Sequence, residues 1–200
     1  MCKWQVPFLA LFCLVAGYCS AQDTIRDRST GKSFPMTVSF QAEGKDYNLE
    51  ATGVSTRKKF FVKVYSVAHY MEDPTSVKGE DVYDNILRSN KAKQLTSVWV
   101  RNVNQKKVQN GYRESFGKIL SSQEMSQLKA DMDKYLDFFG DVHTDDQHVI
   151  RWLPDGTVTV EINGEMKGSV NNPTFAQALW SVWFGKKSVV KRDQLVSQIK

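Results

Sequence analysis

The chain has 200 residues, of which 24% are charged and 41% are hydrophobic, and its formal net charge is +5. This length suits one domain with a sizeable core, and the charge is too mild and too evenly scattered to indicate a nucleic-acid partner. All three cysteines lie within the first 19 residues. A mature chain without that segment cannot form disulfides, use a catalytic thiolate or bind zinc through cysteine.

The first 21 residues have the pattern of a secretory signal peptide. Lys3 supplies the positive n-region, residues 6–15 the apolar h-region, and residues 19–21 a cleavage site of small residues. The apolar run is too short for a transmembrane helix. An alternative interpretation attaches a lipid at Cys19, although the bulky tyrosine before it disfavours this. We therefore expect a signal peptide over 1–21, a single domain over 22–200, and export to a bacterial periplasm.

The first half of the mature chain predicts strands followed by helices. A polar, loose arm at 22–33 precedes three segments rich in β-branched and aromatic residues, which predict strands: 35–41, 46–54 and 59–71. A weakly amphipathic helix at 80–89 and a strand at 95–103 follow. Apolar residues at helical spacing then predict two helices, the first capped by Asn104 and the second by Ser121 with Glu124, ending at Gly140.

The second half predicts a β-meander and a last pair of helices. Asp-Gly and Asn-Gly turns separate three short strands: 148–153, 157–162 and 165–170. Asn172 and Pro173 then open a tryptophan-rich helix that ends at Gly185, and a short helix is expected within 190–199. This order predicts an α+β fold with an antiparallel sheet.

The predicted strand at 59–71 is the most informative segment. Strict alternation places the odd-numbered residues from Phe61 to Met71, which include Lys63, Tyr65 and Val67, on one face. That face mixes apolar bulk with polar groups, as the wall of a ligand cleft does. The pattern alone favours a plainer interpretation, in which a central strand has one core face and one amphipathic face.

Three segments resemble the chalcone isomerase-like family. Residues 61–72 (Phe-Val-Lys-Val-Tyr-Ser-Val-Ala-His-Tyr-Met-Glu) look like its signature strand, 99–103 (Trp-Val-Arg-Asn-Val) like the strand before its helix, and 175–185 like its C-terminal helix and glycine stop. They occur in the family's order and resemble its bacterial, stand-alone branch. The resemblance implies an open-faced β-sandwich, with helices on one face of a large antiparallel sheet and a ligand cleft between the layers.

The resemblance also implies that chalcone isomerase activity is absent. The hydroxyl and amide side chains of the catalytic members fall here on Tyr65, Val108, Ser115 and Val182. Each lost donor would cost ~2.7–4 kcal/mol of barrier stabilisation, so we assign no catalytic residue.

The same resemblance implies a pair of ligand-binding residues that this chain retains. The fatty-acid-binding branch holds a carboxylate with an arginine and a tyrosine, which match Arg57 and Tyr65; without a gap the arginine falls on Gly53. A guanidinium can donate two parallel hydrogen bonds to a carboxylate, and a phenol adds a third. Eight residues of straight strand span ~26 Å, so the pair requires a bend near the basic turn at 56–59.

Other residues complete the expected site. Lys63, on the predicted face of Tyr65, and Arg101, beside Trp99, are alternative sources of the anchoring charge. The candidate lining residues are apolar or aromatic: Phe61, Val67, Tyr112, Val182 and Trp183. Trp180 and Phe184 lie off the apolar stripe of their helix and are assigned either to the core or to the cleft mouth.

No metal or cofactor is expected. The three histidines, His69, His143 and His148, include no pair at the i,i+4 spacing of a zinc site, and phosphate- or dinucleotide-binding motifs are absent from the sequence. A weak cation site in the polar loop of His143 and His148, beside Asp141, Asp145 and Asp146, stays open as a minor alternative.

The sequence therefore predicts a protein that binds a small apolar carboxylate, such as a fatty acid, without catalysis. One alternative is an intramolecular lyase or isomerase that uses Tyr65 as an acid or base. Another is an interaction module of the cell envelope with a filled cleft. The oligomeric state is not predicted.

Overall fold

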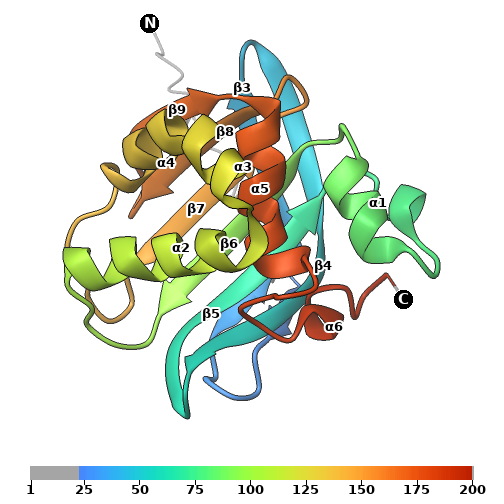
Figure 1. The fold of residues 1–200 in the computed structure, drawn as a ribbon. Coiled ribbons are helices and arrows are strands. Elements are labelled where there is room, and N and C mark those ends of the chain that lie inside the picture. Colours follow the sequence, from blue (N-terminus) through green and yellow to red (C-terminus); the bar gives the residue numbers. More distant parts are fainter. Residues whose placement is uncertain (1–22, 200) are drawn as a thin grey trace, which may run out of the picture.

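The computed structural model describes residues 23–199, so the predicted signal peptide lies outside the described residues. Seven strands form one antiparallel sheet in the order of the sequence: β3 (Thr37–Ala42), β4 (Lys45–Lys59), β5 (Val62–Met71), β6 (Lys93–Trp99), β7 (Gln147–Trp152), β8 (Thr157–Ile162) and β9 (Glu165–Asn171). The sheet curls, and helices cover one of its faces (Figure 1).

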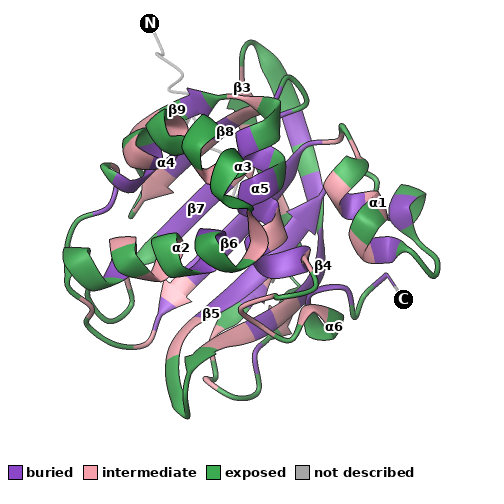
Figure 2. Cartoon of the chain, in the orientation of Figure 1, coloured by how far each residue is buried: buried purple, intermediate pink, exposed green. Residues whose placement is uncertain are grey.

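The helical layer consists of four helices on that face: α2 (Gln105–Ile119), α3 (Ser122–Gln127), α4 (Lys129–Leu136) and α5 (Pro173–Phe184). A 3₁₀ turn, η1 (Pro74–Val77), and α1 (Val82–Arg88) pack beside α5, and α6 (Arg192–Leu195) lies against β4. The larger core cluster fills the space between sheet and helices, as the burial colours show (Figure 2). The expected open-faced α+β architecture is therefore confirmed.

The helix starts follow from local capping. The Asn104 side chain accepts a hydrogen bond from the backbone of Lys107, Ser121 and Glu124 form a complete capping box, and Asn172 caps α5. The single helix expected up to Gly140 is instead two helices. The chain leaves helical geometry at Leu128 (φ −94°, ψ 4°), whose side chain is buried.

The described part of the arm, residues 23–33, is not loose. Strands β1 (Thr24–Arg26) and β2 (Ser33–Pro35) pair with each other as a separate ribbon. Phe34 is 1% exposed and belongs to the second core cluster, which also contains Ala68 and Tyr70 of β5. Burial of Phe34, packing of Ile25 and the hydrogen bonds that buried Asp27 accepts from Thr56 and Ser66 hold this otherwise polar segment in place.

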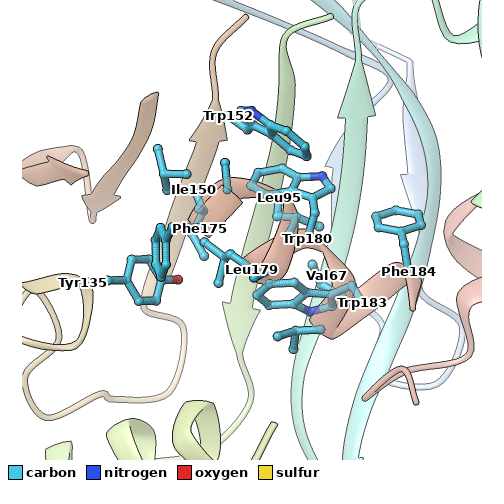
Figure 3. Packing of buried hydrophobic residues seen from close by; sticks show 14 of the residues in the cluster. Val67, Leu95, Tyr135, Ile150, Trp152, Phe175, Leu179, Trp180, Trp183 and Phe184 are labelled. Atoms are coloured by element: carbon cyan, nitrogen blue, oxygen red, sulfur yellow. The ribbon is translucent and has the colours of Figure 1, made fainter. Parts of the chain in front are cut away.

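Helix α5 is largely buried, with Pro173, Thr174 and Gln177 as its exposed positions. Its two tryptophans, Trp180 and Trp183, and its C-terminal residue, Phe184, are each at most 1% exposed. They pack over the sheet beside Val67 and Leu95 (Figure 3). Trp180 and Phe184 thus belong to the core, and neither reaches a cleft mouth.

The expected strand at 59–71 begins later than the sequence indicates. Phe60 and Phe61 form a two-residue turn between β4 and β5, and pairing begins at Lys59 with Val62. Both phenylalanines are strong strand formers, and neither glycine nor asparagine marks the turn.

Among residues 23–199, none of the helices has both the length and the apolar character needed to cross a bilayer.

Candidate ligand-binding cleft

A cleft of about 550 Å³ lies between the sheet and helix α2, with its floor on β5 and β6. This volume is within the ~300–1,000 Å³ typical of small-molecule sites. Its inner wall is mostly apolar or aromatic, and its outer rim carries charged and amide side chains. The inner wall includes Val64, Tyr65, Trp99, Val108, Tyr112 and Val182.

The β4–β5 hairpin brings Arg57 and Tyr65 together. The two residues are direct partners across the antiparallel pair, and Tyr65 is in turn the partner of Trp99 on β6. The chain reverses at Phe60 and Phe61, so the separation along a straight strand does not apply. Both side chains line the cleft.

A β-bulge decides which face of β5 enters the cleft. Arg57 pairs with Tyr65 and Lys58 with Lys63, which leaves Val64 without a partner on β4. Such a bulge shifts the side-chain alternation by one residue. Val62 and Val64 therefore line the cleft together with Tyr65.

Two expected site residues consequently lie elsewhere. The Lys63 ammonium donates a hydrogen bond to the Ser29 backbone carbonyl, outside the cleft lining. Phe61 is 98% exposed at the hairpin turn. Residue pattern alone does not reveal the bulge, and this is why alternation counted from Phe61 leads to the wrong face.

Tyr65 has a neutral phenol with a hydrogen-bond donor to spare. Burial raises the pKa of Tyr65, although the Arg57 guanidinium and a hydrogen bond from Trp183 each act to lower it. The indole Nε1 of Trp183 donates to the Tyr65 hydroxyl oxygen over 3.3 Å. Because an indole N–H only donates, the phenol keeps its own proton for an acceptor in the cleft.

Arg57 is fixed in place but not saturated. Its Nη1 donates to the Val189 carbonyl over 2.8 Å, and Val189 also lines the cleft. A guanidinium has five N–H donors, so several remain for an anion. Arg101 also lines the cleft but is exposed, in the chain just after β6.

The inner end of the cleft offers few polar groups. Val108 and Val182 stand at positions where catalytic relatives are expected to carry hydroxyl or amide groups, and both line the wall. The Ser115 hydroxyl donates to the Gly111 carbonyl of its own helix over 2.7 Å. This end can hold an apolar chain, because the Ser115 hydroxyl is engaged within its own helix.

Of the remaining expected lining residues, only Tyr112 borders the cleft beside Val182. Val67 and Trp183 are buried behind the wall, at 0% and 1% exposure. Trp183 acts through its hydrogen bond to Tyr65. The lining residues that sequence reasoning missed include Trp99, Val62, Val64, Val189 and Gly111, and their roles depend on the bulge and on tertiary packing.

A second, larger hollow of about 1140 Å³ lies between the N-terminal ribbon, β4 and the C-terminal segment. Charged and polar side chains dominate its lining, including Arg26, Asp27, Lys58 and Lys191. A larger share of its lining is polar than in the smaller cleft, and it does not contain Tyr65, so we assign ligand binding to the smaller cleft.

Gly53, the other position to which the family arginine could be matched, does not line the cleft. A Cβ atom there would come within 2.1 Å of the Gln194 backbone oxygen, because the C-terminal segment packs directly on this residue. The gapped match of the family arginine to Arg57 is therefore the one that reaches the cleft. Within the described residues, no cluster of three or more potential metal ligands occurs.

Comparison with known proteins places this fold in a family. A sequence search of curated proteins gives no match. Among solved structures, the fold is similar to a crystal structure of a fatty-acid binding protein from Arabidopsis thaliana, with a TM-score of 0.71 and 17% identity; the match covers 88% of this chain and 97% of that one. A family model for chalcone isomerase-like proteins matches residues 28–195. The resemblance of the three sequence segments is thus confirmed, and the chain belongs to the chalcone isomerase-like family.

Proposed function

We propose that this protein binds a small apolar carboxylate, such as a fatty acid, in the cleft between the sheet and helix α2, and that it does not catalyse chalcone isomerisation. The observation that carries the proposal is the pairing of Arg57 with Tyr65 across the hairpin, at an apolar cleft. A guanidinium and a neutral phenol together present the donors that a carboxylate accepts.

The chemistry of the cleft favours binding over turnover. Its acid–base candidate, Tyr65, has a raised pKa, and the positions expected to hold further catalytic donors are the valines 108 and 182. The fatty-acid binding protein from Arabidopsis thaliana has the same fold, which supports the choice of ligand class. The open volume of the cleft disfavours a purely packed interaction module.

Export belongs to this proposal as well. Its support is the signal-peptide pattern of residues 1–21, and we place the mature protein in the periplasm of a bacterium.

The decisive test is to purify the protein, extract it with organic solvent and identify bound lipid by mass spectrometry. We expect a stoichiometric fatty acid in the wild type and none in an Arg57→Ala/Tyr65→Phe variant. An empty extract from folded wild-type protein, together with no displacement of a fluorescent fatty-acid probe by palmitate, would overturn the proposal.

Single variants identify the anchor. Hydrogen bonds to a charged group contribute ~1.5–3 kcal/mol, so Arg57→Ala should weaken palmitate binding by about 10- to 100-fold. Arg101→Ala is the matched control, because it removes an exposed arginine from the same cleft rim. A larger loss in Arg101→Ala than in Arg57→Ala would move the anchor to Arg101.

A further inference from the structure

The β4–β5 turn exposes more aromatic surface than any other described part of the chain. Phe60 is 88% exposed, Phe61 is 98% exposed and Val62 is 47% exposed. The only other large hydrophobic residue among residues 23–199 with comparable exposure is Met166, at 56%. The paired ends of β4 and β5 carry this turn beyond the helical layer (Figure 1).

The backbone conformation of this turn is energetically unfavourable for the two phenylalanines that form it. Residues 23–199 contain three two-residue hairpin turns, and the other two contain glycine: Glu43-Gly44 and Asn163-Gly164. Phe60 adopts φ +56°, as Glu43 (φ +53°) and Asn163 (φ +52°) do at the same position of the other turns, in the left-handed region that disfavours bulky side chains; only in the β4–β5 turn does no glycine follow. Strain of this kind, in a solvent-exposed turn that glycine or asparagine would form more easily, indicates a role for the aromatic rings themselves.

Basic residues surround the exposed rings. Lys58, Lys59 and Lys63 are all exposed, and no acidic residue occurs between Glu50 and Glu72 in the sequence. Lys59 pairs with Glu114 over 3.0 Å, with half of each side chain exposed. The surface of an anionic bilayer has negatively charged headgroups above apolar acyl chains. The exposed rings are complementary to the acyl chains, and the lysines around them are complementary to the headgroups.

We propose that the β4–β5 tip, defined as Lys58 to Lys63, docks this protein on anionic lipid bilayers. Phe60 and Phe61 insert between the headgroups, and the three lysines bind lipid phosphates. Membrane docking needs no occupant in the cleft and so goes beyond the proposed function. Its consequence for ligand transfer rests on the proposed function: Lys59, Phe60 and Val62 also line the cleft, so docking would place the cleft mouth against the bilayer.

The test is vesicle flotation of the purified wild-type protein, stripped of lipid. We expect binding to vesicles of phosphatidylcholine with 30% phosphatidylglycerol, weak binding to phosphatidylcholine alone, and a loss of binding at high salt. Phe60→Ser/Phe61→Ser should lower the partition coefficient at least tenfold. Lys58→Gln/Lys59→Gln should lower it about fivefold for each charge removed.

Two control variants test the location. Met166→Ser removes an exposed hydrophobic side chain from β9, and Lys78→Gln removes an exposed lysine next to η1; neither should change binding. All of these positions are exposed, and equal melting temperatures would establish that the variants are folded.

The absence of cysteine after residue 21 permits a direct measurement. An environment-sensitive dye on Phe61→Cys should shift its emission to the blue when anionic vesicles are added, whereas the same dye on Met166→Cys should not. No binding of the wild type to anionic vesicles, or unchanged binding of the double phenylalanine variant, would overturn the proposal. Self-association through the tip in place of vesicle binding, detected by light scattering, would overturn it as well.

Discussion

Two tryptophans of α5 contact β5 in the same way, yet the two ends of this interface differ in kind. Trp180 donates its indole N–H to Nε2 of His69, and Trp183 donates to the hydroxyl of Tyr65, each over 3.3 Å. The end at His69 is closed, because that ring is fully buried, and the end at Tyr65 opens into the cleft.

At the closed end, every polar group has a partner. An indole donates only, so Nε2 of His69 accepts and the proton of the neutral ring lies on Nδ1, which donates to Thr52 Oγ1 over 2.7 Å. Thr52 in turn donates to the Leu195 carbonyl over 2.6 Å. His69 is 0% exposed. A buried chain of satisfied hydrogen bonds stabilises the fold and leaves nothing for a ligand.

At the open end, the donors outnumber the acceptors. The Tyr65 phenol and the Arg57 guanidinium both retain unused N–H or O–H groups beside an apolar cavity. The difference shows that a strand–helix interface can be closed over one turn and open to a cleft over the next. Satisfaction of hydrogen bonds, rather than residue type, distinguishes the two ends.

Truncation of the closed end should have the largest effect. His69→Ala removes a fully buried ring and leaves the Trp180 indole without an acceptor, so we expect a loss of about 3–5 kcal/mol in the free energy of unfolding. Tyr65→Ala is the matched truncation at the open end, where a half-buried side chain should cost less. Urea denaturation of both variants gives the comparison, and an equal or larger loss at Tyr65 would refute it.

Acidification should destabilise the protein through its buried histidines. Burial holds the pKa of His69 well below its usual range and lowers the pKa of His148 to about 4. Below pH ~6.5 the unfolded chain binds protons that the folded chain does not, so stability is present above that pH and is lost as the pH falls toward 4.

The expected slope is up to ~1.4 kcal/mol per pH unit for each histidine. Urea unfolding between pH 7.5 and 5.0 measures it, and His148→Gln should reduce the slope by about half. A free energy of unfolding that stays constant over this range would contradict the assignment of two neutral, buried histidines.

A larger side chain in the cleft should weaken ligand binding without lowering the free energy of unfolding. Gly111 on α2 lines the cleft, and a Cβ atom there meets no other atom within 4 Å. We expect Gly111→Leu to weaken palmitate binding at least tenfold, because leucine occupies ligand space. The free energy of unfolding should rise by ~0.5–1 kcal/mol, because glycine is a poor helix former.

Gly117 provides the control on the same helix. It is exposed, has equal room for a Cβ atom and lies outside the cleft lining. Gly117→Leu should therefore keep full affinity with a similar gain in helix stability. Equal loss of binding in both variants would mean that the cleft is not the ligand site.

The smallest effect is expected at Ser115. Its hydroxyl lies at the cleft wall but is used within α2, by the Gly111 carbonyl. Ser115→Ala should change palmitate affinity less than about twofold, because a neutral hydroxyl that is already paired contributes little. Isothermal titration calorimetry measures this directly. A loss of tenfold or more would place a polar ligand group at the inner end.

The fold was predictable where local chemistry decides it. Asn104, Ser121 and Asn172 cap helices as their residue types predict, and the glycine-containing turns set the meander. The resemblance to the family supplied the layer order. These features depend on a few neighbouring residues, so a single sequence is enough to reveal them.

The details of the site were not predictable in the same way. The turn at Phe60 and Phe61 has no glycine to mark it, and the bulge at Val64 has no sequence signature, yet together they decide which face of β5 enters the cleft. Arg57 and Tyr65 were identified through the resemblance, whereas Val189 reaches Arg57 only through the tertiary fold.

The contact between Thr52 and Leu195 joins residues 143 positions apart. The hydrogen-bond chain through His69 therefore cannot be completed until the polypeptide has been synthesised as far as Leu195.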